Sequence, residues 1–218
     1  MGRSLCAPAQ VLRVSNVMAK RAGDDHAVAM LPLGRGPRLL EQADEPTELL
    51  VACHGRIRHF SEVALRLARG AGHPVAEVIE AAKGVHRYFS VALPLHERDE
   101  EDSIAPRLLE SAARSEVQDA LARMTDEHRA IDALIEQTMP LWQRVAAQPE
   151  VLASLTDELE DRAVRLASLF EPHLALEEGT LFPAIARALP RGTRVILLRE
   201  IRARRTPEVR AQMASLRH

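Results

Sequence analysis

The stretch HERDEEDSIAP, residues 96–106, recurs in altered form as HLALEEGTLFP, residues 173–183. Both stretches contain His, three residues, a Glu-Glu pair, four residues and Pro. Each lies within a long pattern of apolar residues at three- and four-residue steps, which is typical of one face of an α-helix. The same polar residues therefore interrupt two apolar stripes at matching points. This repetition predicts a helical protein built from two similar halves.

Four long amphipathic helices are predicted around these two stretches. Their approximate bounds are residues 46–69, 74–110, 115–147 and 150–189, with Gly and Pro residues at several of the breaks. Only 3% of the residues are aromatic, and the chain is rich in Ala, Leu, Arg and Glu, which favours helices over a β-sandwich or barrel. The short connections predict an all-α, up-down-up-down four-helix bundle.

Three parts of the chain differ in composition. Residues 1–45 have no sustained period and contain LPLGRGP, which predicts a loosely structured extension. Residues 46–190 are predicted to form the bundle as one domain. Residues 191–218 carry eight Arg against two Glu and are expected to form a basic tail or short helix. A solvated helix face is the simplest interpretation of such a run, and contact with a protein partner is the alternative.

Charge and cysteine content exclude several classes of partner. The net charge of −2 argues against nucleic acid or an anionic membrane as a general partner. No apolar run approaches the ~20 residues that span a bilayer, and the N-terminal stretch lacks the apolar core of a signal peptide. The two cysteines, Cys6 and Cys53, cannot form a disulfide framework. We therefore expect a cytoplasmic protein.

The polar residues of the apolar stripes are spaced to meet at one point. Residues four apart on a helix are separated by about 40° and 6 Å of rise, so His96 with Glu100, and His173 with Glu177, aim in one direction. A lone histidine lies on the stripe of the helix before each pair, 42 residues upstream in the first half and 45 in the second. The six candidate metal ligands are His54, His96, Glu100, His128, His173 and Glu177.

A metal centre would account for this set of residues. Unpaired carboxylates in an apolar bundle are each unfavourable by several kcal/mol, at order-of-magnitude level. Imidazole and carboxylate together suit iron, manganese or zinc, whereas calcium and magnesium prefer oxygen ligands. We predict two metal ions, each bound by two histidines, with Glu100 and Glu177 shared between them. Such a centre keeps coordination positions open, which indicates chemistry or sensing.

At these residues the sequence resembles the hemerythrin-like, or HHE, cation-binding family. The resemblance covers roughly residues 46–190 and rests on the motifs ACHGRIR, HERDEE, EHRAI and HLALEEGTLFP. It implies a four-helix bundle with two non-haem irons. Ferritin-type di-iron proteins use Glu-x-x-His motifs instead, so the spacing disfavours that class.

Two departures from the oxygen-carrying hemerythrins bear on function. Those proteins place a second His four residues after the ligand of the third helix, where this chain has Asp132. They also place an Asp five residues after the His of the last helix, whereas Glu177 follows at four. These differences resemble the branch linked to oxygen or iron sensing, nitric oxide response or peroxide handling.

The resemblance implies a protein that binds or reacts with O2, NO or peroxide in sensing or stress defence. Peroxide decomposition would make it an enzyme, and the sequence leaves that open. Iron handling, or repair of iron–sulfur clusters, is one alternative. A metal-stabilised regulatory module that acts through its basic C-terminus is another.

Several nearby residues are interpreted in other roles. Glu101 and Glu178 lie about 100° from the ligand stripe, so they are expected to be exposed or to contact ligands without binding metal. Pro94 and Pro172 lie just before His96 and His173, and we expect the kinks that they introduce to orient the ligand-bearing turns. Three further histidines lie off the stripe and are interpreted as surface residues: His59, His73 and His86.

Overall fold

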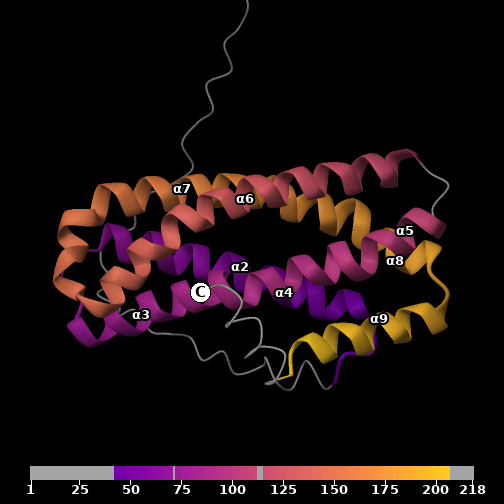
Figure 1. Ribbon diagram of the computed structural model, residues 1–218, viewed down its shortest axis with the longest axis horizontal. Coiled ribbons are helices and arrows are strands. Elements are labelled where there is room, and N and C mark those ends of the chain that lie inside the picture. Colours follow the sequence, from indigo (N-terminus) through magenta and orange to yellow (C-terminus); the bar gives the residue numbers. More distant parts are fainter. Residues whose placement is uncertain (1–41, 71, 112–114, 207–218) are drawn as a thin grey trace, which may run out of the picture.

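The structure of the chain is a computed structural model that describes residues 42–70, 72–111 and 115–206. Within those residues it is helical and contains no strand (Figure 1). Most of the predicted extension at residues 1–45 lies outside the described part, as do residues 207–218 of the basic C-terminus. None of the described helices combines the length and apolar content that crossing a membrane requires.

The four predicted helices are present, with ends within two residues of the predicted bounds. The first is α2 (Pro46–Arg69), where Pro46 occupies the first turn and requires no hydrogen bond there. The second is a continuous helical run made of α3 (Val75–Arg87), η1 (Tyr88–Ala92), α4 (Leu93–Arg98), η2 (Asp99–Ile104) and α5 (Ala105–Ser111).

The second half of the chain repeats this arrangement. The third helix is α6 (Ser115–Ala147), followed by a short 3₁₀ turn, η3 (Pro149–Val151). The fourth run comprises α7 (Leu152–Leu176), η4 (Glu177–Leu181) and α8 (Phe182–Ala188). A further helix, α9 (Arg191–Arg204), follows Pro190 and turns back along the bundle (Figure 1).

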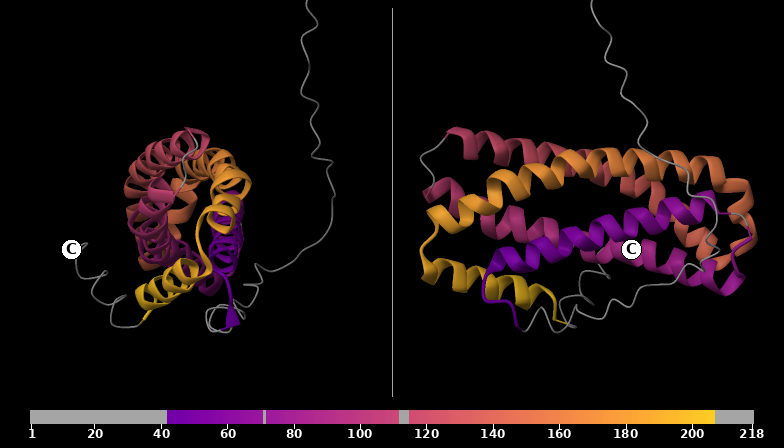
Figure 2. Two further views of the ribbon diagram at one scale, coloured as in Figure 1. Left: turned by 90° about the vertical axis from the view of Figure 1, so that its right-hand side faces the viewer. Right: turned by 180° about the vertical axis from the view of Figure 1, so that it is seen from behind.

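The helical runs alternate in direction and form the predicted up-down-up-down bundle. Helix α2 packs beside α3 and α7, and α6 also packs beside α3 and α7. Figure 2 shows the bundle end-on, with α9 outside it against α2. The prediction of an all-α, up-down-up-down four-helix bundle is therefore confirmed.

Three π-helical turns, η1, η2 and η4, interrupt helices that the sequence predicts as regular. Each turn ends two residues before a proline, which lacks the N–H that would bond to the carbonyl four residues earlier. The residue immediately before each proline instead donates its N–H to the carbonyl five residues back. These donor and acceptor pairs are Leu93 and Tyr88, Ala105 and Glu100, and Phe182 and Glu177.

The π turns explain the fixed distance between the glutamates and the prolines. Pro106 and Pro183 each lie six residues after a candidate ligand, Glu100 or Glu177, whose own carbonyl accepts the π-type hydrogen bond. Such turns are frequent at functional sites, because one extra residue per turn redirects the following side chains. Pro172 differs, since it lies within α7 away from any π turn.

The core consists of two apolar clusters separated by a polar layer. One cluster fills the end of the bundle near the turn between α2 and α3, and includes Ile57, Leu93 and Phe170. The other fills the opposite end and includes Leu50 and Leu181. Along each helical run the polar residues come between members of the two clusters. The layer between the clusters is the candidate site.

Candidate metal centre

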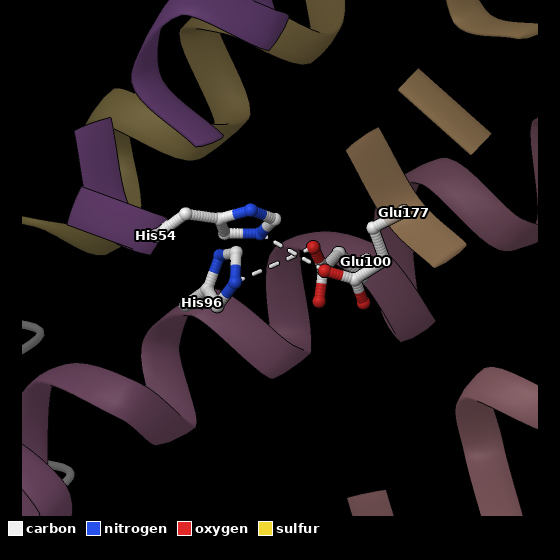
Figure 3. Close-up of side chains that lie close together, drawn as sticks. All are labelled: His54, His96, Glu100 and Glu177. Atoms are coloured by element: carbon white, nitrogen blue, oxygen red, sulfur yellow. Dashed lines mark ion pairs between the residues drawn. The ribbon is translucent and has the colours of Figure 1, made fainter. Parts of the chain in front are cut away.

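All six predicted ligands lie in this polar layer, and at least one comes from each helical run of the bundle. Each is no more than 3% exposed, and they are His54, His96, Glu100, His128, His173 and Glu177. The structure therefore brings together the whole set that sequence spacing singled out. Figure 3 shows four of them converging, with His54 from α2 facing Glu177 and His96 facing Glu100.

The carboxylate of Glu177 lies between the two pairs of histidines. Its Oε2 atom is 2.9 Å from Nε2 of His54. Its Oε1 atom is 3.1 Å from Nε2 of His173 and 3.8 Å from Nε2 of His128. One oxygen thus faces the first half of the duplicated fold and the other faces the second half.

Glu100 has the corresponding position on the opposite side. Its Oε1 atom is 3.5 Å from Nε2 of His96, and its Oε2 atom is 3.5 Å from Nε2 of His128. The donor atoms form two groups, each with all its ligand atoms within 4.8 Å of one another. Glu177 belongs to both groups: His54, His96, Glu100 and Glu177 in the first, and His128, His173 and Glu177 in the second.

The inward-facing atoms fit a bound cation. Nε2 of His54, His96 and His128 and the carboxylate oxygens of Glu100 and Glu177 make no hydrogen bond of acceptable geometry in the described part of the chain, although several of these atoms lie 2.9–3.8 Å apart. A buried polar group without a partner is unfavourable by about 1–3 kcal/mol, and more when it is charged. So many such atoms around one point require compensation, which a bound metal would provide.

Burial shifts the pKa of four of these groups in the direction that favours their neutral forms. It raises the pKa of Glu177 to about 8 and that of Glu100 well above its usual value. It lowers the pKa of His173 to about 4 and that of His96 well below its usual value. Neutral imidazole is the form that binds metal, whereas a protonated carboxyl group must lose its proton first. Metal binding at neutral pH would therefore release the proton that Glu177 holds.

The second glutamate of each Glu-Glu pair contacts a histidine of the opposite half. Oε1 of Glu178 is 2.7 Å from Nδ1 of His54, and Oε1 of Glu101 is 2.8 Å from Nδ1 of His128. A carboxylate at Nδ1 favours the tautomer that carries its proton there, which frees Nε2 for a metal. The doubled glutamates are thus explained, because the first faces the centre and the second orients a histidine.

Two further contacts were not predicted from the sequence. Oε2 of Glu127 is 3.2 Å from Nδ1 of His173, and Arg123 binds the other oxygen of Glu127 at 2.7 Å. The signal that could have found Glu127 is its position directly before His128. His96 differs from the other three histidines, because its Nδ1 atom is buried and has no partner among the described residues.

The other histidines of the described residues do not join the cluster. His59, His73 and His86 are partly buried and belong to neither group of donor atoms, in keeping with their interpretation as non-ligands. Phe89 and Phe170 stack in the apolar core, with their ring centroids 5.9 Å apart.

Comparison with known proteins agrees with this arrangement. The family described as hemerythrin HHE cation binding domain matches residues 45–185. The chain is also 27% identical over 147 residues to an uncharacterized protein of Haemophilus influenzae, a match that covers 65% of this chain and 80% of that protein. Because the family match spans well over half of the 218 residues, the protein belongs to the hemerythrin HHE cation-binding family and contains a metal-binding module.

Proposed function

We propose that the six residues of the polar layer hold two iron ions, and that this centre binds or reacts with O2, NO or peroxide. The role would be sensing or stress defence in the cytoplasm. The observation that carries the proposal is the pair of overlapping donor groups that share Glu177 and contain buried, unpartnered nitrogen and oxygen atoms. A single structural ion would not need two such groups.

The chain divides the donors evenly between the two ions. His54 and His96 would hold one ion, His128 and His173 would hold the other, and both glutamates would contact both ions. Bound iron supplies redox chemistry and vacant coordination positions for a small ligand. Zinc and manganese accept the same donor types, so the identity of the metal is part of the test.

Apolar side chains flank the site. The ring centroid of Phe182 is 4.9 Å from that of His54, and the apolar clusters lie on both sides of the polar layer. Exclusion of water strengthens the electrostatic interactions at the donors and protects a reactive centre from side reactions. A small, weakly polar ligand enters such a layer more easily than a charged metabolite does.

The test is metal analysis and spectroscopy of protein purified without oxygen. We expect about two irons per chain, from the two donor groups that the geometry provides, and a new absorption band when air, NO or peroxide is admitted. His54→Ala should lose iron and the band, whereas His59→Ala on the same helix should keep both. Zinc without a spectral response, or no bound metal, would contradict the proposal.

Peroxide distinguishes an enzyme from a sensor. Sustained loss of excess peroxide, at a rate that depends on His54, would assign peroxide decomposition as the activity. A spectral change that stops after about one equivalent per centre would assign ligand sensing, because binding alone does not turn over.

A further inference from the structure

A buried carboxylate beside the metal centre is held by the end of the last helix. Asp99 lies directly before Glu100, at the start of η2, and is fully buried. Its Oδ1 atom is 3.0 Å from Nη1 of Arg204, and its Oδ2 atom is 2.5 Å from Nη2 of Arg205. The side chains of Arg204 and Arg205 are only 16% and 11% exposed, so this is a largely buried ion cluster and not a surface pair.

The same two arginines reach both sides of the first donor group. Nη2 of Arg205 donates a hydrogen bond to Sγ of Cys53, 3.6 Å away, and Cys53 directly precedes His54 on α2. Nη2 of Arg204 donates to Oγ of Ser103, 2.6 Å away in η2. The arginines therefore join α2 to η2 at the level of the metal centre.

Packing along α9 fixes the position of these arginines. Leu197 belongs to the apolar cluster at that end of the bundle, and Ile201 packs in a small cluster with Leu49. Glu200 accepts two hydrogen bonds from Arg107 of α5, at 2.8 and 3.1 Å. The interpretation of this basic run as a solvated face is thus wrong for the end of α9, which is anchored against the bundle.

The arginine side of this contact lies outside the region matched by the family. The family match ends at residue 185, whereas α9 covers Arg191–Arg204. The repeat within the chain does not contain it either, because the position three residues after the ligand histidine is Asp99 in the first half and Leu176 in the second. The ion cluster is therefore an addition to the duplicated bundle.

We infer that Arg204 and Arg205 are positioning residues of the metal centre, which hold through Asp99 the turn that carries Glu100. This inference rests on the proposed function. A planar guanidinium can contact Asp99 and Cys53 together, which a lysine ammonium cannot do with the same geometry. Two arginines and one aspartate also give the cluster a net charge of +1. In a buried layer this charge is weakly screened, so it favours the reduced state of an adjacent iron pair.

Charge-changing variants of the full-length chain test this inference. We would measure the midpoint potential and the iron affinity of Arg205→Gln, Asp99→Asn and Arg205→Lys, with Arg199→Gln as the control. Arg199 is an exposed arginine on the same helix. Circular dichroism would establish that each variant is folded, and a chelator competition would give the affinity independently of any activity.

The midpoint potential is expected to shift in opposite directions in Arg205→Gln and Asp99→Asn. Arg205→Gln removes a positive charge and should lower the potential, whereas Asp99→Asn removes a negative charge and should raise it. Arg205→Lys should keep a potential near that of the wild type but bind iron about tenfold more weakly, a loss of the size found when residues that support metal ligands are changed. If Arg205→Gln does not fold, the other two variants still decide the question.

The outcomes separate this inference from the proposed function. Wild-type protein that binds no iron would overturn both. Wild-type protein that binds iron, with the Arg205 and Asp99 variants indistinguishable from Arg199→Gln, would overturn the inference alone. Shifts of the potential in the same direction for Arg205→Gln and Asp99→Asn would also overturn it.

Discussion

The two halves of this protein bring a His and a Glu to the centre in the same way, but they differ at one position of the segment that carries them. Segments 96–106 and 173–183 each place a buried His and Glu four residues apart, begin or continue a π turn at the Glu, and reach a proline six residues later. Three residues after the His, however, the first has Asp99, paired with two arginines, and the second has Leu176, packed against an apolar cluster.

This difference separates what the metal centre needs from what its surroundings add. The ligands and the prolines occur in both halves, because both halves must turn a carboxylate toward the same point. The residue three positions after each His, Asp99 or Leu176, does not face the centre. Its side chain can therefore contact other parts of the protein. The first half uses it to bind α9, and the second half uses it for ordinary packing.

The largest effect is expected at the shared carboxylates. Glu177 faces histidines of both halves at 2.9 and 3.1 Å, whereas Glu100 lies 3.5 Å from each of its two histidines, His96 and His128. Glu177→Ala should therefore abolish binding of both ions, and Glu100→Ala should abolish at least one. Metal content per chain measures this, with the exposed Glu136→Ala as the control. Two irons retained by Glu177→Ala would refute the assignment.

Making the first segment resemble the second should destabilise the chain. Asp99→Leu leaves two largely buried guanidinium groups without their carboxylate, and breaking a buried ion cluster in this way lowers the free energy of unfolding by about 3–5 kcal/mol. Denaturant unfolding of the metal-free protein measures the loss. The double variant Asp99→Leu with Arg205→Met should recover part of it. An unchanged midpoint for Asp99→Leu would show that the cluster is unimportant for stability.

Replacing Glu101 or Glu178, which each contact a histidine of the opposite half, should weaken metal binding less, and by a similar factor in the two halves. Glu178→Gln and Glu101→Gln each remove a carboxylate from Nδ1 of a histidine in the opposite half, and each should weaken metal binding by about 10–100-fold. Competition with a chelator measures the affinity. The control is Glu62→Gln, which affects an exposed pair with Arg66. Equal affinities in all three variants would remove the orienting role of these glutamates.

The smallest effect is expected from pH. In metal-free protein the raised pKa of Glu177, about 8 against 4.5 for a glutamate in the unfolded chain, stabilises the fold at low pH, and this contribution is lost as pH rises toward 8. His173, with its pKa lowered to about 4 from 6.5, has the opposite effect between those two values. Stability of metal-free protein should therefore fall between pH 6.5 and 8.

Thermal unfolding of metal-free and iron-loaded protein at several pH values measures this dependence. Glu177→Gln cannot lose a proton in this range, so it should flatten the decline in the metal-free protein. A metal-free protein that becomes more stable between pH 6.5 and 8 would contradict the expected direction.

Sequence periodicity predicted the fold because the bundle is amphipathic throughout. Helix geometry alone was enough to predict which candidate ligands share a face. His96 and Glu100 lie on one face wherever the helix continues, and the repeat predicts a second helix with the same pair. The clustering of all six residues follows from the same spacing. Their role as ligands remains a prediction, because it depends on metal and not on packing alone.

The features that escaped prediction depend on contacts between distant parts of the chain. The π turn at Glu100 depends on a proline six residues away, and its hydrogen bonds are not visible as a change in apolar period. The pairing of Asp99 with Arg205 joins residues 106 positions apart, so no local pattern marks it. In the sequence Glu127 is one more charged residue on a helix, and only the packing of α7 against α6 brings His173 beside it.

The most direct test of the account is anomalous diffraction at the iron edge from crystals of protein loaded with iron(II) under nitrogen. We predict two iron peaks per chain in the polar layer, one beside His54 and His96 and the other beside His128 and His173, with both glutamates between them. A single peak, or peaks outside this layer, would contradict the assignment of a di-iron centre to these six residues.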